Sequence, residues 1–76
     1  MENFIKILES IRPDINFREE KELIDGGFLD SFDIVCIVSE LNDYFEISIR
    51  VTELKPENFN SLEAIYNMCI QLQNSK

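Results

Sequence analysis

The chain has 76 residues, a formal net charge of −8 and no histidine, and these values exclude several classes of protein. A domain of this length buries only about 60–65% of the surface that its unfolded chain exposes, which leaves little room for a deep enclosed active site. The acidic excess repels nucleic-acid phosphates and anionic membranes, and without histidine the commonest general base and metal ligand is missing. We therefore expect one domain over residues 1–76 that is not an enzyme, binds no nucleic acid and holds no metal.

The cysteines and the hydrophobic runs indicate the compartment of the protein. Cys36 and Cys69 are far apart and form no C-x-x-C pair, so the sequence predicts neither a zinc site nor a disulfide framework. No signal-peptide pattern opens the chain, and no apolar run approaches the roughly 18 residues needed to span a bilayer. These features predict a soluble, cytoplasmic monomer without stable membrane insertion.

The first part of the chain predicts a helix followed by a long loop. Apolar residues recur at helical spacing at Phe4, Ile5, Leu8 and Ile11, and Pro13 then ends the run. From residue 14 to residue 29 this periodicity fades among charged residues. Apolar side chains that can hold the loop against a core are Ile15, Phe17, Leu23, Ile24, Phe28 and Leu29. Gly26 and Gly27 predict a turn at the end of the loop.

A second helix is predicted from Ser31 to Phe45. Its apolar stripe, at the spacing that faces a core, comprises Ile34, Ile37, Val38, Leu41 and Phe45. The alternation of Ile47, Ile49 and Val51 suggests a strand, but an isolated strand has no partner for its hydrogen bonds. We therefore expect this segment to be a loop that enters the core.

The last part of the chain predicts a short helix and a long one. Pro56 to Phe59 reads as one helical turn, with proline tolerated at the first position. Ser61 can cap a final helix that ends near Gln73. Its inward residues are Leu62, Ile65, Cys69 and Leu72, and Tyr66 and Met68 flank them. The predicted fold is all-α: a small four-helix bundle of three main helices and one short helix.

The start of the second predicted helix has an unusual pattern of side chains. Asp30 suits the N-cap, and Asp33 three residues later gives a pair that resembles a capping box. Ser31 then occupies the first helical position, beside the positive end of the helix dipole, where an attached anionic group such as a phosphodiester is favoured. The alternative is that Ser31 is an ordinary residue at a helix start.

The segment Gly27-Phe28-Leu29-Asp30-Ser31-Phe32 resembles the acyl carrier protein family, in which an Asp-Ser-Leu motif opens the second helix. The likeness covers nearly the whole chain. Further similar segments are Glu40-Leu41, Tyr44-Phe45, Ile47-Ser48-Ile49 and residues 59–65.

The resemblance implies a cofactor, partners and a cargo. In the family the motif serine carries a 4′-phosphopantetheine arm derived from coenzyme A, which here implies Ser31. The cargo would be a thioester on that arm, shuttled between partner enzymes. The implied partners are a phosphopantetheinyl transferase, an adenylate-forming acyl or aminoacyl ligase, and a downstream acyltransferase or synthase.

Departures from the family pattern bear on the cargo. Phe32 replaces the usual leucine or methionine, and Cys36 and Asn42 stand where fatty-acid carriers typically have glutamates. These departures dilute the acidic recognition helix of fatty-acid carriers. The segment Gly27-Phe28-Leu29-Asp30-Ser31 is more similar to aminoacyl carriers, including the D-alanine carriers of cell-wall teichoic acid modification. An unmodified acidic helical module that binds a partner is the alternative from another functional class.

The residues around Ser31 are candidates for binding partners. Asp30, Asp33, Glu40 and Asp43 could form an acidic edge complementary to basic partner surfaces, and Phe32 and Val35 an exposed apolar contact. The alternatives are that the first two aspartates only cap the helix and that Glu40 and Asp43 are ordinary solvated charges. Phe32 could instead fold inward, and Val35 could pack against the short helix. The sequence around Ser31 lacks the G-x-S-x-G frame of hydrolases, and the acidic segments lack the ligand spacing of an EF-hand.

Overall fold

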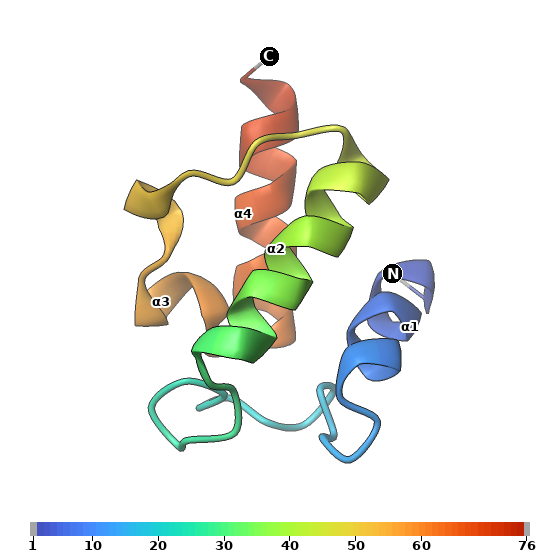
Figure 1. Ribbon diagram of the computed structural model, residues 1–76, viewed down its shortest axis with the longest axis vertical. Coiled ribbons are helices and arrows are strands. Elements are labelled where there is room, and N and C mark those ends of the chain that lie inside the picture. The colour runs from blue at the N-terminus through green and yellow to red at the C-terminus, as the bar shows by residue number, and fades with distance from the viewer. Residues whose placement is uncertain (1, 76) are drawn as a thin grey trace.

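The computed structural model describes residues 2–75, which form four α-helices and one 3₁₀ turn and contain no β-strand (Figure 1). The elements in chain order are α1 (Glu2–Ile11), α2 (Ser31–Phe45), η1 (Val51–Glu53), α3 (Pro56–Phe59) and α4 (Leu62–Asn74). The predicted all-α bundle of three main helices and one short helix is therefore confirmed. The bounds of α2 and α3 are those that the sequence predicted, and α4 extends one residue beyond Gln73.

The three main helices enclose one core. In Figure 1, α2 crosses α4, α1 lies beside α2, and α3 meets the beginning of α4. On α2 the predicted stripe is buried at Ile37, Leu41 and Phe45 and half-buried at Ile34 and Val38. The side chains of highest burial in the core are Phe4, Ile5, Leu8, Phe17, Leu23, Ile37, Leu41, Phe59, Ile65 and Cys69.

Two side chains of α4 are buried to a different extent from the prediction. Met68, which the sequence placed at the flank of the apolar face, is buried in the core, and Leu72, predicted to face inward, is only half-buried. Leu72 lies in the last turn of α4, which ends at Asn74, and lines a surface pocket together with Glu46 and Ile47. None of the helices within residues 2–75 is long and apolar enough to cross a membrane.

The long loop between α1 and α2 is fixed by backbone hydrogen bonds as well as by apolar contacts. The carbonyl of Leu23 accepts bonds from the N–H groups of Phe28 and Leu29, at 3.0 and 2.9 Å. The side-chain oxygen of Asn60, at the junction of α3 and α4, accepts the N–H groups of Ile24 and Asp25, both at 3.0 Å. The loop is therefore attached to the junction of α3 and α4 a few residues before it enters α2.

The side chains that anchor this loop differ in part from the prediction. Ile15, Phe17, Leu23 and Leu29 are buried as expected, and Ile24 is half-buried. Phe28 is 41% exposed, so the prediction that it holds the loop against the core is wrong. Its backbone follows Gly27, which has a φ of 79°, and the predicted glycine turn carries the Phe28 side chain outward.

The segment after α2 enters the core and then leaves it. Glu46 ends the helix in the left-handed conformation, with a φ of 54°. Ile47 is buried, and the N–H of Ile49 donates to the side-chain oxygen of Asn42 at 2.9 Å. Val51 is 84% exposed because the chain turns into η1 at that residue, so the inward loop ends at Ile49 rather than at Val51.

Candidate functional site at the start of helix α2

A complete capping box begins α2. The Asp30 side-chain oxygen Oδ1 accepts the N–H of Asp33 at 2.9 Å, and Oδ2 of Asp33 accepts the N–H of Asp30 at 3.2 Å. These two bonds satisfy backbone donors that the first turn of a helix otherwise leaves unpaired. The capping pair that the sequence predicted is therefore confirmed, and it fixes the backbone on both sides of Ser31.

Ser31 is the first residue of α2, and its side chain is exposed. The backbone N–H groups of the first helical turn and the positive end of the helix dipole are directed to this end of the helix, so an anionic substituent is favoured here. The serine hydroxyl is thus accessible to a large partner and lies where an attached phosphate group is electrostatically stabilised.

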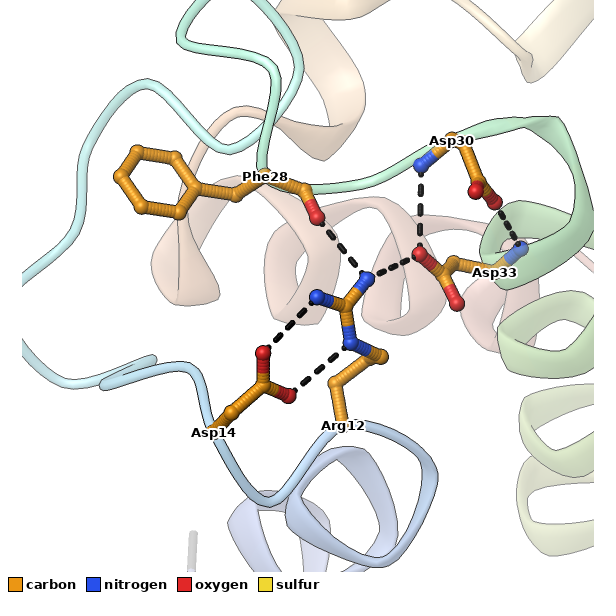
Figure 2. A network of polar contacts seen from close by, with 5 residues as sticks. All are labelled: Arg12, Asp14, Phe28, Asp30 and Asp33. Atoms are coloured by element: carbon orange, nitrogen blue, oxygen red, sulfur yellow. Dashed lines mark hydrogen bonds and ion pairs between the residues drawn. The ribbon is translucent and has the colours of Figure 1, made fainter.

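The guanidinium group of Arg12 also supports the first turn of α2. Figure 2 shows Arg12, which follows α1, reaching the carbonyl oxygen of Phe28 and the carboxylate of Asp33 with one nitrogen, Nη1. Its Nε and Nη2 donate to the two carboxylate oxygens of Asp14, at 3.0 and 2.9 Å. This two-point contact lowers the pKa of the Asp14 carboxyl, chiefly through its hydrogen bond with Arg12. No local sequence pattern identifies Arg12, which is 21 residues from Asp33.

Asp33 is the one predicted partner-facing residue that does not face solvent. Its relative exposure is 7%, and its carboxylate binds Arg12 and the N–H of Asp30. A buried carboxylate needs such partners because the loss of its hydration is costly. The capping role of Asp33 is confirmed, but its side chain is directed into the fold, which does not support a place in an acidic partner surface.

The other candidate partner residues lie on the surface. Phe32 is 74% exposed and Val35 is 65% exposed, so neither folds inward. Asp30, Glu40 and Asp43 are also exposed. A shallow depression of about 500 Å³ between α1 and α2 includes Phe32, Val35 and Glu40 in its lining. Asp30 and Phe32 therefore flank Ser31 on the surface, whereas Glu40 and Asp43 lie more than two turns further along α2.

An apolar groove of about 340 Å³ has Ser31 in its lining. It lies between α2 and the segment that contains α3, and its apolar lining is formed by Ile24, Ile34, Val35, Leu54, Pro56 and Phe59. Lys55 is the charged residue in this lining. Val35 therefore borders the groove beside the short helix and still keeps most of its surface in solvent. The groove gives a flexible group attached at Ser31 an apolar wall to contact.

No cluster of three acidic, cysteine or histidine side chains that could hold a metal ion occurs within the described residues. Cys36 is half-buried on α2, and Cys69 is buried on α4. Burial raises the pKa of the Cys69 thiol to about 12.

Comparison with known proteins gives relatives of similar length. The chain is 32% identical to the D-alanyl carrier protein of Streptococcus uberis over 62 residues, which cover 82% of this chain and 78% of the relative. It is 28% identical to the D-alanyl carrier protein of Streptococcus mutans over 72 residues, or 93% and 91% of the two chains. The D-alanyl carrier protein of Streptococcus suis is also 28% identical, over 75 residues and 97% and 95% of the two chains. No family model matches the sequence. The extent of these alignments, together with the helical bundle, shows that the chain belongs to the acyl carrier protein family, as its sequence resemblance indicated.

Proposed function

We propose that this carrier holds its cargo as a thioester on a 4′-phosphopantetheine arm attached to Ser31. The observation that carries the proposal is the exposed hydroxyl of Ser31 at the first position of a capped helix. The apolar groove that Ser31 lines and the acidic, apolar surface around it are consistent with this role. The arm, once attached, supplies a thiol that forms the thioester with the cargo.

The attachment reaction would use Ser31 only as a nucleophile. Its oxygen forms a new bond to the phosphorus that carries the pantetheine part of coenzyme A, and the bond from this phosphorus to the nucleotide breaks. Adenosine 3′,5′-bisphosphate leaves, and the hydroxyl proton passes to a base supplied by the transferase. As membership of the carrier family implies, a separate phosphopantetheinyl transferase would supply that base.

We test the attachment site by intact-mass measurement. The protein is incubated with coenzyme A, magnesium and a broad-range transferase, and we expect one phosphopantetheine group to be added. Ser31→Ala should abolish the addition and leave the helical circular dichroism unchanged. Ser39→Ala is the matched control, because Ser39 is another exposed serine on α2, and it should be modified like the wild type. Continued labelling of Ser31→Ala would refute the assignment.

D-alanine is the cargo that we propose, because three relatives with this name cover most of the chain. The loading enzyme would then be an adenylate-forming ligase that activates the carboxyl group of the amino acid and transfers it to the thiol of the arm. A downstream acyltransferase or synthase would receive the cargo. Tethering keeps the cargo at a high effective concentration near each of these enzymes.

The cargo is tested by thioester formation on the modified protein. Candidate ligases are supplied with D-alanine, with other amino acids and with fatty acids, and the products are compared by mass. We expect the D-alanyl thioester to form most efficiently. Loading by fatty acyl ligases alone, with no aminoacyl thioester from any ligase, would contradict the cargo and leave the attachment site intact.

We also propose that the exposed residues around Ser31 are a docking surface for these enzymes. Phe32 and Val35 offer apolar contact area, and Asp30, Glu40 and Asp43 offer negative charge. Charges at the rim of an interface change the association rate more than the affinity. Raising the ionic strength should therefore slow loading mainly through association, because exposed charges are screened beyond about 8–10 Å at ordinary salt.

A further inference from the structure

Two kinds of contact fix the backbone around Ser31, one within α2 and one from a different part of the bundle. The capping box joins Asp30 and Asp33 within the first turn of α2, so it would move together with this helix end. Arg12 belongs to a different part of the bundle, one residue after α1 ends. Its contacts with Phe28 and Asp33 therefore fix the helix start relative to α1 and not merely within α2.

The two anchor points of Arg12 lie on both sides of Ser31 in the sequence. The carbonyl oxygen of Phe28 precedes the serine by three residues, and the carboxylate of Asp33 follows it by two. Figure 2 shows both acceptors bound by the same guanidinium nitrogen. The Ser31 side chain itself is exposed, so the backbone between these anchors sets the position of the Cβ atom about which the hydroxyl rotates.

The guanidinium is held in turn by Asp14, which binds its other edge. Arg12 Nε and Nη2 each donate to one oxygen of Asp14, and this planar two-point geometry is specific to arginine. A lysine has a single ammonium group, which cannot bind both oxygens of Asp14 while reaching Phe28 and Asp33. Asp14, Arg12 and Asp33 therefore form one chain of charged contacts that ends at the turn of Ser31 (Figure 2).

We propose that Arg12 is a positioning residue for the modification of Ser31, an inference that rests on the proposed function. By holding the backbone from Phe28 to Asp33, Arg12 keeps the Cβ of Ser31 in the position from which its oxygen reaches the phosphorus of coenzyme A in the transferase. Ser31 then forms the phosphodiester bond as adenosine 3′,5′-bisphosphate leaves, and Arg12 contacts neither reactant. Small errors in the orientation of a reacting atom can slow a reaction by about a hundredfold.

The test compares Arg12→Gln with Arg18→Gln in the transferase reaction. Each variant removes one positive charge, and Arg18 forms an exposed ion pair with Glu2, 2.8 Å apart. We expect Arg12→Gln to lower kcat for phosphopantetheine transfer roughly tenfold to a hundredfold, with a much smaller change in KM. Arg18→Gln should keep the wild-type kcat. Arg12→Lys should lie between wild type and Arg12→Gln, and it carries the comparison if Arg12→Gln does not fold.

A second measurement separates positioning from general stability. Amide hydrogen exchange should increase at residues 29–33 of Arg12→Gln while the exchange of the buried half of α2 stays slow. Equal kcat for Arg12→Gln, Arg18→Gln and wild type, well below their unfolding temperatures, would overturn the inference and leave the proposed function standing. So would faster exchange spread evenly over α2 with an unchanged kcat. Failure of the wild type to be modified at Ser31 would instead overturn the proposed function itself, and the inference with it.

Discussion

The two ends of helix α2 are held in place by different physical means. At the C-terminal end, Phe45 makes edge contacts with Phe4 and Tyr66, with ring centroids 6.0 and 6.3 Å apart. At the N-terminal end, the contacts are a capping box and the ion pair of Arg12 with Asp33, and the apolar side chain of Phe32 is exposed.

This difference gives the two ends of α2 different combinations of stability and exposed surface. Apolar burial stabilises a fold without directional bonds, but it removes the buried side chains from any partner. Hydrogen bonds and ion pairs fix the backbone by their geometry and leave neighbouring apolar side chains on the surface. The end of α2 that carries Ser31 is held in the second way, so Phe32 and Val35 stay accessible while the serine keeps its position.

The largest effect on stability is expected from the buried face of α2. Leu41 is fully buried, and Leu41→Ala should lower the free energy of unfolding by about 2–5 kcal/mol because it leaves a cavity in the core. A domain this small has a stability of only about 3–5 kcal/mol, so the variant could be largely unfolded. Urea unfolding followed by circular dichroism measures the change. A cost below about 0.5 kcal/mol, as for an ordinary surface substitution, would contradict the burial of this face.

At the N-terminal end, the loss of the cap should cost less. Asp30→Ala removes the acceptor for the Asp33 N–H and should lower the free energy of unfolding by about 0.5–2 kcal/mol. Asp43→Ala is the control, because it removes an exposed aspartate of the same helix outside the cap, and it should change stability by less than about 0.5 kcal/mol. If both variants lose the same stability in urea unfolding, the cap does not contribute as its geometry indicates.

A pair of exposed aromatic residues tests the contrast between the two ends directly. Phe32 is 74% exposed at the N-terminal end, and Tyr44 at the other end lies in edge contact with Phe45, with ring centroids 5.0 Å apart. Tyr44→Ser should lower the free energy of unfolding by about 0.5–1.5 kcal/mol through the loss of this contact. Phe32→Ser should change it by less than about 0.5 kcal/mol.

The same two variants should rank in the opposite order in the transferase reaction. Phe32→Ser should raise KM for the carrier, because Phe32 lies next to Ser31 on the proposed docking surface, while Tyr44→Ser should keep KM near the wild-type value. Steady-state kinetics on the folded proteins measure this. Equal KM values for the two variants would remove Phe32 from the docking surface.

Chemical labelling of the two thiols tests the burial of the core with the smallest change to the protein. Burial raises the pKa of Cys69 from an ordinary value of 9.0 to about 12, so the thiol stays protonated in the folded protein at pH 8. Cys36 is half-buried and should react with a thiol reagent first, whereas Cys69 should react only on unfolding. Because burial disfavours the thiolate, the fold should lose stability as the pH rises from 9.0 towards the folded pKa of about 12. Rapid labelling of Cys69 in the native protein would show that α4 opens readily.

Local sequence patterns were enough to predict the helices and the position of Ser31 at a helix start. Apolar spacing gave the bounds of α2, because a helix face needs a contact every three or four residues, and the Asp30 and Asp33 pair gave its start. These signals are local, since each depends on residues within a few turns of one another. The capping box was therefore predictable before any tertiary contact was known.

Tertiary structure alone decided which surfaces the loops present and what supports Ser31. Arg12 meets Asp33 across 21 positions of sequence, and no local pattern marks a charge that will pair at this distance. Phe28 and Val51 were expected inside and are exposed, because the direction of a loop side chain depends on the turn that carries it and not on hydrophobicity alone. Asp33 differs from its prediction in the opposite direction, because its charge predicted an exposed residue and it is buried. Its burial is possible because the guanidinium of Arg12, which follows α1, forms an ion pair with its carboxylate.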